Sequence, residues 1–448
     1  MEKETDNLME KIQSLAKRRG FIYQGSDIYG GLAGTWDYGP LGVALKNNIK
    51  ESWRKKFVSS RSDMYEVDAA ILMNPKVWES SGHVATFSDP LVECTKCKRR
   101  FRADQLKEAG RCDECGSPVG EPRQFNMMFE TKIGAMEDSA ATVYLRPETA
   151  QGIFVNFKNI IDSFHPKLPF GIAQIGKAFR NEITPRDFVF RVREFEQMEI
   201  EYFVKPADWE KYFEYLKEEM LAWMEELGLD MNKVHELEVA PEDLAHYSKR
   251  TIDFEFDYPF GKKELYGLAY RGSFDLDAHS TGSGTELAYL EEDTSADQAQ
   301  GSKKFVPHII EPSFGVDRTV LALLMSAYAE DITAGEVRSF LKFKPSTAPV
   351  ICAVSPLLKN KPELVEKAKF IYGMLKAEFG RVMWDDNGNI GKRYRRQDEI
   401  GTPWCIVVDF ETIVGPETDT VTVRDRDTGT QERIAVGDLV LHLKNKLN

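Results

Sequence analysis

Long hydrophobic runs are absent from this sequence. None approaches the ~18–20 consecutive apolar residues that a membrane-spanning helix needs, so we expect no membrane span. Residues 1–20 alternate acids and bases around Leu8, Ile12 and Leu15, which predicts an amphipathic surface helix and no signal peptide. We therefore expect a cytoplasmic protein.

Glycine-rich nucleotide-binding loops are also missing. The sequence has no Walker A motif, and residues 281–285 lack the strand and helix that flank a Rossmann loop. No serine, histidine and aspartate stand out in an order typical of nucleophilic catalysis. Internal repeats and low-complexity tracts are absent as well. These absences argue against P-loop and dinucleotide-binding enzymes and give no support to a covalent protein nucleophile.

Basic residues are outnumbered by acidic ones, and the formal net charge is −13. This charge argues against a protein that coats nucleic acid without specificity. It does not exclude local contact, because basic patches decide where phosphates bind. The densest patch is at residues 392–396, which we interpret either as a solvated charged loop or as a surface that meets nucleic acid. The chain of 448 residues predicts roughly two to four domains.

A charged hairpin is the most informative feature that is present. Arg180 and Glu182 are two residues apart and are predicted to share one face of a strand, because side chains alternate along a strand. After a proline-containing turn, four more side chains are predicted to share a face of a second strand: Arg191, Phe195, Gln197 and Glu199. Such a face can hold a nucleotide, with arginine on phosphate, glutamate on the adenine amine and phenylalanine against the ring. A solvated strand pair with surface ion pairs is the alternative.

Four of the six cysteines form two Cys-x-x-Cys pairs, namely Cys94, Cys97, Cys112 and Cys115. Two pairs at this separation match two knuckles that hold one tetrahedral Zn²⁺. Four thiolates close the coordination shell, so we expect a structural ion that organises an insertion at residues 85–125. Cys352 and Cys405 fall in apolar segments and are predicted to be core residues.

Helical and strand patterns follow one another along the rest of the chain. We expect helices at residues 41–58, 209–227 and 316–329, and another that starts at Pro147. Strands are expected at 142–145 and 308–311, and residues 231–310 mix short strands with loops. A change of pattern at 344–349 predicts a linker. Beyond it, strands at 350–354, 405–408 and 420–424 alternate with helices at 363–379 and 436–447, which predicts a small α/β domain.

Charged residues at element ends are further candidates for a site. Glu148 is expected in the first turn of the helix from Pro147, where a carboxylate also suits the helix dipole. Arg318 is expected in the first turn of the helix after Gly315, where a cation opposes the dipole. That position indicates a nucleotide contact, with a packing role as the alternative. Two further groups are predicted from strand alternation: Glu311 with Ser313, and Glu264 with Arg271 and Asp275.

Together these motifs resemble the class II aminoacyl-tRNA synthetases, and within them the homodimeric glycyl-tRNA synthetase family. Residues 34–60 look like motif 1, the dimer-interface element of that class, residues 171–204 like motif 2 and residues 308–329 like motif 3. The glycine assignment rests on residues 146–152, Tyr38-Gly39-Pro40, Arg271 and residues 311–315. The resemblance covers nearly the whole chain.

The resemblance implies an α+β fold with an antiparallel sheet core and helices. Residues 1–345 are expected to form the catalytic domain, with a zinc-ribbon-like insertion at 85–125, and residues 346–448 the α/β anticodon-binding domain, where Gly401-Thr402-Pro403-Trp404 is a recognisable stretch. It further implies glycine, ATP and tRNA(Gly) as partners, Mg²⁺ as a cofactor, and a homodimer without a membrane.

The resemblance also assigns site residues. Arg180, Glu182 and Arg318 are expected to be catalytic, with Arg180 on the α-phosphate, Glu182 on the adenine amine, Arg191 and Arg318 at the γ-phosphate, and Phe195 with Arg318 around the adenine. ATP is expected to contact Arg180, Asn181, Glu182, Phe190, Arg191, Val192, Arg193, Glu194, Phe195, Glu264, Leu265, Gly315, Val316, Asp317 and Arg318, with Glu264 as a Mg²⁺ ligand. Glycine is expected to contact Arg100, Glu148, Phe195, Glu196, Gln197, Met198, Glu199, Arg271, Glu311, Pro312, Ser313, Phe314 and Gly315.

Glycine is the smallest amino acid, so its site can discriminate by exclusion and no editing domain is expected. Three alternatives stay open. A sister enzyme for proline or threonine would differ in the residues around the amino acid. A catalytically inactive synthetase-like protein would lack the ATP-binding arginines, which are present here. A zinc-ribbon protein that binds nucleic acid would leave the motif 3 segment unexplained.

Overall fold

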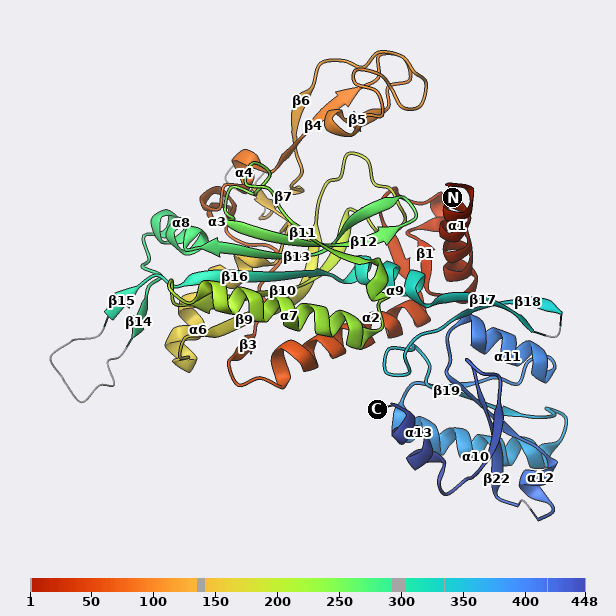
Figure 1. The fold of residues 1–448 in the computed structure, drawn as a ribbon. Helices are drawn as coiled ribbons and strands as arrows, with labels where there is room; N and C mark the ends of the chain where they lie inside the picture. Colours follow the sequence, from red (N-terminus) through yellow and green to blue (C-terminus); the bar gives the residue numbers. More distant parts are fainter. Residues whose placement is uncertain (1, 135–141, 292–302, 334, 417, 448) are drawn as a thin grey trace, which may run out of the picture.

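A seven-stranded sheet forms the centre of the computed structural model, which describes residues 2–134, 142–291, 303–333, 335–416 and 418–447 (Figure 1). The strand order is β11-β12-β13-β16-β10-β9-β3. Neighbouring strands are antiparallel except β3 and β9, so the expected antiparallel core is confirmed with one parallel edge strand. The strands are β3 (Met64–Glu66), β9 (Phe170–Phe179), β10 (Glu194–Val204), β11 (Val234–Glu238), β12 (Arg250–Tyr258), β13 (Gly261–Gly272) and β16 (His308–Gly315).

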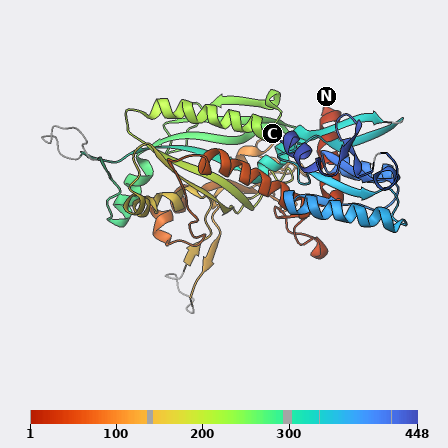
Figure 2. The same ribbon diagram turned by 90° about the horizontal axis from the view of Figure 1, so that it is seen from below.

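Three helices cover one face of this sheet and form the main core with it. Figure 2 shows two of them, α2 (Pro40–Arg54) and α7 (Trp209–Leu227), across the sheet as seen from below; the third is α9 (Val316–Ala327). Trp53 of α2 and Trp223 of α7 both pack on Phe314 of β16, with ring centroids 6.1 and 5.3 Å away. Truncating a buried aromatic of this kind costs about 3–5 kcal/mol. This face therefore holds β16 and β10 in place beneath the site.

The predicted helix at residues 41–58 is present, and its entry explains a glycine. It consists of α2 and one π-helical turn, Lys55–Ser59. A Cβ on Gly42 would lie 2.0 Å from the carbonyl oxygen of Phe21, so only glycine lets the start of α2 approach that segment. The predicted N-terminal helix is α1 (Glu2–Arg19), with Ile12 and Leu15 buried; Met1 lies outside the described residues.

Short helices and a second core lie on the opposite face, around the end of the sheet. They are α3 (Pro75–Ser80), α4 (His83–Thr86), α5 (Ala150–Phe154), α6 (Phe157–Phe164) and α8 (Phe274–Ser283). Two predictions are wrong here. The helix expected from Pro147 begins at Ala150, so Glu148 precedes it, and Asp275 lies on α8 and not on a strand. Residues 231–310 also hold longer strands than expected, and their part 292–302 lies outside the described residues.

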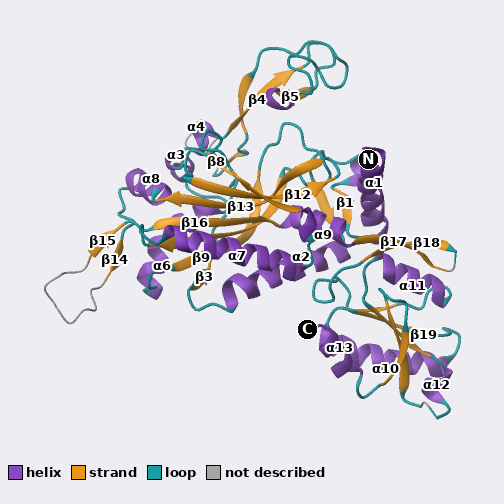
Figure 3. Ribbon diagram, viewed as in Figure 1, coloured by secondary structure: helices purple, strands orange, loops and turns teal. Residues whose placement is uncertain are grey.

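The cysteine-bearing insertion stands apart from the central sheet (Figures 1 and 3). It contains a three-stranded sheet of β4 (Ser88–Glu93), β5 (Arg100–Arg102) and β6 (Arg123–Asn126). Smaller two-stranded sheets pair β1 (Ile22–Gln24) with β2 (Trp36–Tyr38), β7 (Glu130–Lys132) with β8 (Thr142–Tyr144), and β14 (Tyr289–Glu291) with β15 (Lys303–Phe305). Among the described residues, no helix combines the length and apolarity needed to cross a membrane.

The C-terminal part is the expected α/β unit with its own core. Its sheet has the order β20-β19-β21-β22-β23 and pairs parallel strands at β20, β19 and β21. The elements are β19 (Cys352–Pro356), α10 (Pro362–Phe379), β20 (Val382–Trp384), α11 (Ile390–Glu399), β21 (Trp404–Val408), α12 (Phe410–Ile413), β22 (Thr420–Asp425), β23 (Gln431–Ala435) and α13 (Leu439–Leu447). Cys352 and Cys405 are buried, as predicted.

Two predictions about the connection and its charges need correction. The expected linker is packed: Thr347 is buried, and its hydroxyl donates to the carbonyl of Leu227 at 2.9 Å. The basic run at 392–396 is part of helix α11 and is not a loop. Within it, Arg393 is buried and donates to backbone carbonyls, Arg396 pairs with Asp385, and Arg395 pairs with Glu336, so three of the four cations have partners within the protein.

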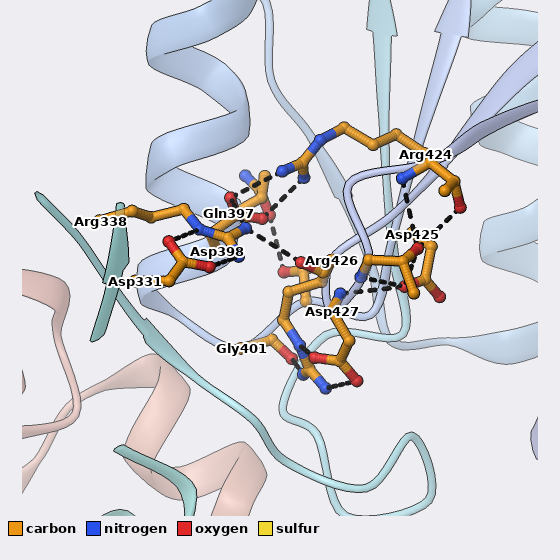
Figure 4. Close-up of polar contacts among 12 residues, drawn as sticks. Asp331, Arg338, Gln397, Asp398, Gly401, Arg424, Asp425, Arg426 and Asp427 are labelled. Carbon is orange, nitrogen blue, oxygen red and sulfur yellow. Dashed lines mark hydrogen bonds and ion pairs between the residues drawn. The ribbon is translucent and has the colours of Figure 1, made fainter. Parts of the chain in front are cut away.

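A polar junction joins the C-terminal unit to the rest of the molecule (Figure 4). The hairpin β17 (Tyr328–Thr333) and β18 (Glu336–Leu341) carries Arg338, whose Nη1 donates to Asp398 Oδ2 at 2.9 Å. Arg424 of β22 donates to both carboxylate oxygens of Asp398 at 2.8 and 3.0 Å. Asp398 is 1% exposed, so one buried carboxylate holds two arginines from different units.

Candidate active site

A cavity of about 540 Å³ lies on the sheet face opposite the main core. Strands β10, β13 and β16 supply its floor, and the loop between β9 and β10 forms one wall. Most of the predicted ATP and glycine residues line it: Glu148, Arg180, Glu182, Phe190, Arg191, Val192, Phe195, Glu196, Gln197, Glu199, Glu264, Leu265, Glu311, Ser313, Gly315, Asp317 and Arg318. Residues that are far apart in the sequence thus meet at one concave surface.

The loop between β9 and β10 carries three of the predicted cations, Arg180, Arg191 and Arg193. Strand β9 ends at Phe179 and β10 begins at Glu194, so Arg180, Glu182 and Arg191 lie in the loop and not on strands as predicted. Arg180 Nε donates to the carbonyl of Pro147 at 3.0 Å, which turns its guanidinium toward Phe195, 5.2 Å from the ring centroid. Glu182 Oε2 is buried and accepts no hydrogen bond from the described residues.

Arg318 reaches the same cavity from the first turn of α9, as predicted. Its Nη1 donates to the backbone carbonyl of Glu264 at 2.9 Å and lies 3.2 Å from the carboxylate of that residue. The guanidinium stacks on Phe190, 4.4 Å from the ring centroid. Arg318 lowers the pKa of Glu264, which therefore stays ionised. An unfavourable position for a cation at a helix N-terminus is thus compensated by a carboxylate.

Asp253 is a neighbour of Glu264 that the sequence analysis did not select. Both carboxylates face the space above Gly267, where each lies 4.0 Å from the position of an ideal Cβ. Burial and the charge of Glu264 raise the pKa of Asp253 to about 7. Two carboxylates on adjacent strands at one point of the cavity form a set of oxygen ligands that suits a divalent cation.

The deep end of the cavity gathers the predicted glycine residues. Ser313 Oγ donates to Glu199 Oε1 at 3.2 Å, and Arg271 Nη1 donates to Glu311 Oε2 at 2.8 Å. Arg271 itself is 1% exposed and lies behind Glu311, so it touches the cavity only through that carboxylate. Carboxylates that converge on a space with a single nearby guanidinium offer a binding site for an ammonium group.

Several partners of these carboxylates were missed. His83 Nε2 lies 3.3 Å from Glu148 Oε2, and although burial opposes ionisation, His83 holds the pKa of Glu148 well below its ordinary value. Thr149 donates to Glu199. Asp275, which was already singled out in the sequence, binds Arg271 in two contacts of 2.7 and 2.8 Å. Thr149 lies within the segment 146–152 and could have been found there. His83 comes from a helix of four residues with no distinguishing pattern.

Other predicted residues do not reach the cavity, for reasons visible in the strand alternation. Met198, Phe314 and Val316 point into the main core, on the other face. Glu194 is exposed and pairs with Lys177, while Asn181 and Pro312 do not line the cavity either. Arg193 binds the carbonyls of Glu182 and Ala33, which braces the loop. These residues support the site without lining it.

Arg100 is also outside the cavity. Its side chain is 60% exposed and pairs with Glu93 at 3.2 Å. Arg102, two residues further along β5, lines the cavity instead and donates to Asp89 at 2.6 Å. The insertion thus contributes Arg102, and not Arg100, to the lining of the cavity.

Glu196 and Asp317 line the cavity but are held by lysines from α2. Lys46 lies 3.0 Å from Glu196 Oε2 and 3.2 Å from Asp317 Oδ1. Tyr38 donates to the same Asp317 oxygen at 2.5 Å, and the amide of Glu196 donates to Asp317 Oδ2 at 2.7 Å. This buried cluster ties α2, β10 and α9 together beneath the cavity.

The four cysteines of the insertion gather as predicted. All four Sγ atoms lie within 4.8 Å of one another. Cys94 and Cys115 are 3.5 Å apart, and Cys97 and Cys112 are 3.6 Å apart. Zn–S bonds of ~2.3 Å in a tetrahedron place sulfur atoms about 3.8 Å from one another, so the donor set fits a Zn²⁺ ion.

Comparison with known proteins gives a consistent result. The family model "tRNA synthetase class II core domain (G, H, P, S and T)" matches residues 129–327, and "Anticodon binding domain" matches residues 351–446. The curated relative from Lachnospira eligens, named glycine--tRNA ligase, is 48% identical over 472 residues, with 98% of this chain and 99% of the relative covered. Relatives of the same name from Treponema denticola and Geobacillus thermodenitrificans are each 48% identical and cover 98% of this chain and 97% of their own length.

Proposed function

Because the chain belongs to the glycine–tRNA ligase family of class II aminoacyl-tRNA synthetases, we propose how its cavity performs the reaction of that family. The enzyme activates glycine with ATP to glycyl-adenylate and pyrophosphate, and it then transfers glycine to the 3′ end of tRNA(Gly). The observation that carries the assignment of residues is the cavity itself, which has cations at one end and clustered carboxylates at the other. ATP presents anionic phosphates to the cations, and glycine presents an ammonium group to the carboxylates.

ATP binds at the end formed by the β9–β10 loop and α9. Arg180 holds the α-phosphate, Arg191 and Arg318 reach the γ-phosphate, and Glu182 accepts from the adenine amine through Oε2, which lies 3.8 Å from Arg191 and accepts no hydrogen bond from the described residues. The adenine lies between Phe195 and Arg318, after Arg318 leaves its stacking partner Phe190. Two anionic reactants approach each other in this step, so arginines that stay charged stabilise the transition state.

The remaining carboxylates of the ATP end are proposed to hold Mg²⁺. Glu264 is the ligand expected from the sequence, and Asp253 faces the same space. When bound, Mg²⁺ would supply charge neutralisation on the phosphates. The chain itself supplies the oxygen ligands and the opposing guanidinium of Arg318, 3.2 Å from Glu264.

Glycine binds at the carboxylate end. Its ammonium group is received by Glu148, Glu199 and Glu311, with Ser313 and Arg271 holding Glu199 and Glu311 in place. Its carboxylate then points toward Arg180 and the α-phosphorus. The buried carboxylates fill the space that a β-carbon would need, so larger amino acids are rejected by exclusion.

Other features of the enzyme are part of the same proposal. The cysteine cluster holds a structural Zn²⁺, residues 1–345 form the catalytic domain with the insertion at 85–125, and residues 346–448 bind the anticodon region. Two copies form a homodimer through the motif 1 segment at residues 34–60. The protein acts in the cytoplasm, where translation takes place.

The test is ATP–pyrophosphate exchange with each of the twenty amino acids, without tRNA. We expect exchange with glycine alone. Exchange with proline or threonine would retain the class II reaction and contradict the glycine site. Absence of exchange with every amino acid, from folded protein that binds tRNA, would contradict the proposed reaction.

A further inference from the structure

Glu201 carries a buried carboxyl group that no hydrogen-bond donor reaches. Its side chain is completely buried on β10, and neither Oε1 nor Oε2 has a hydrogen-bond partner in the described chain. It lies two residues beyond Glu199, on the same face of the strand. A buried carboxylate without a partner is strongly disfavoured, so the protonation state of this group is constrained.

The nearest groups are two further carboxyls. Oxygen atoms of Glu199, Glu201 and Glu311 all lie within 4.8 Å of one another. In the β10–β16 ladder Glu199 pairs with Ser313, and the same register places Glu201 opposite Glu311. Like charges directly opposite each other on two strands destabilise a sheet. At least one member of this triad is therefore expected to carry a proton.

The hydrogen bonds of the triad identify that member. Glu199 accepts from the hydroxyls of Ser313 and Thr149, and Glu311 accepts from Arg271. Burial raises the pKa of both groups, that of Glu311 well above its ordinary value, but their donors oppose this effect because they favour the carboxylate. Glu201 has no such donor among the described residues. A protonated Glu201 has an O–H of its own to donate, and carboxylate oxygens of Glu199 and Glu311 lie within 4.8 Å of it.

The charged groups around Glu201 lead to the same assignment. They are Glu199 on its own strand, Glu311 on β16, Arg271 on β13 and Asp275 on α8. Burial and the charge of Glu311 raise the pKa of Glu201 well above its ordinary value. Arg271 is the cation of the group, and Asp275 already binds it in two contacts. With a guanidinium 2.8 Å from Glu311, a divalent metal at the same oxygens is disfavoured.

We propose that Glu201 is a neutral carboxylic acid that donates a hydrogen bond to Glu311 and thereby fixes the carboxylate that receives the ammonium group of glycine. Glu201 is a positioning residue, because it does not line the cavity and acts through Glu311. Its neutral state also removes one negative charge from the triad, so that Glu201 repels neither Glu199 nor Glu311. The proposal rests on the glycine site proposed above.

Two variants separate the donor from the charge. Glu201→Gln keeps the shape and supplies an N–H donor without charge, whereas Glu201→Leu fills a similar volume without a donor. In glycine-dependent ATP–pyrophosphate exchange we expect Glu201→Gln to stay close to wild type. Loss of a hydrogen bond to a charged group corresponds to about 10- to 100-fold, so we expect Glu201→Leu to raise KM for glycine by that factor. KM for ATP is expected to change in neither variant.

Infrared spectroscopy tests the neutral acid independently of catalysis. The difference between wild type and Glu201→Gln should show loss of the carbonyl stretch of a protonated carboxylic acid. The matched control is Glu51→Gln, which changes an exposed carboxylate on α2 and should leave that band in place. If wild type showed no glycine exchange but the band disappeared in Glu201→Gln, the proposed reaction would fail and the neutral acid would stand.

The proposal is wrong if Glu201→Gln raises KM for glycine as much as Glu201→Leu does. It is equally wrong if no band is lost in Glu201→Gln. Glutamine keeps the volume and lacks the charge, so this variant is expected to fold even if leucine disrupts the strand.

Discussion

At the scale of single residues, the cavity contains arginine side chains that repel one another before any phosphate is present. Burial and the nearby guanidiniums of Arg102, Arg186 and Arg318 act together to lower the pKa of Arg191, with Glu182 opposing them. Arg180 is oriented by a backbone carbonyl and an aromatic ring, and no carboxylate of the described residues pairs with it. The positive potential is therefore only partly compensated, and a triphosphate would relieve the repulsion between the arginines.

This arrangement predicts the effect of Arg180→Ala. We expect adenylate formation, measured as glycine-dependent ATP–pyrophosphate exchange, to fall by about 10²–10³-fold, because one preorganised donor to the reacting phosphate is lost. The melting temperature should stay near that of wild type, since the guanidinium makes a single backbone hydrogen bond at 3.0 Å.

Lys177→Ala is the control for this prediction. Lys177 lies near the end of β9, is 47% exposed and pairs with Glu194 away from the cavity. Its exchange rate should match wild type. Near-normal exchange in folded Arg180→Ala would contradict the assignment of the β9–β10 loop to the α-phosphate.

Much of the site could be predicted at this scale, because it lies in contiguous motifs. Arg180, Glu199 and Arg318 were found from spacing and from resemblance, and all three line the cavity. Glu201 was missed because a glutamate in a strand of alternating acids looks like another solvated charge. His83 was missed since its contact with Glu148 joins segments 65 residues apart, and no local pattern encodes such a contact.

At the scale of secondary-structure elements, strand alternation separates the functional face from the structural one. Along β10, Phe195, Gln197 and Glu199 face the cavity, while Met198 is buried in the main core. The resemblance assigned all of residues 195–199 to the glycine site, whereas the period of two places Met198 on the other face of the sheet. Helix α8 could not be predicted, because its apolar residues do not follow a helical period and its burial depends on α3 and α5.

The insertion is the element whose order depends most on a ligand. Its strands are short, and among the described residues of 88–126 few side chains are fully buried, so the proposed Zn²⁺ replaces a hydrophobic core. We expect one zinc per chain by elemental analysis of protein purified without chelator. Cys97→Ser should lower this content and speed hydrogen exchange in residues 88–126, while β9 and β10 keep their protection.

Cys352→Ala serves as the control for thiol loss, because Cys352 is buried in β19, far from the cluster in sequence and outside its four ligands. Its zinc content should equal that of wild type. A zinc-free wild-type protein with an equally protected insertion would exclude the metal-ribbon interpretation.

At the scale of the whole molecule, the two units are joined by charges that come from widely separated parts of the chain. Glu399 of α11 accepts from Arg18 at 3.3 Å and also pairs with Arg19, and Asp398 links Arg338 to Arg424 (Figure 4). The domain content was predictable from the order of strands and helices. The junction could not be predicted. The basic run at 392–396 resembles a nucleic-acid surface in the sequence, because its partners within the protein come from other parts of the fold.

This junction predicts that Asp398→Asn separates the two reactions of the enzyme. Removing the buried charge leaves Arg338 and Arg424 without their shared carboxylate, and breaking a buried pair in this way costs about 3–5 kcal/mol. The cavity lies on the central sheet and shares none of these residues, so glycine-dependent exchange should be retained. Charging of tRNA(Gly) requires both units in register, so its kcat/KM for tRNA should fall by about tenfold or more, which corresponds to at least 1.4 kcal/mol of lost binding. Asp419→Asn, which removes an exposed pair with Lys367 in the same unit, should leave both activities unchanged. Equal losses of exchange and charging in Asp398→Asn would instead mean that the junction only stabilises the fold.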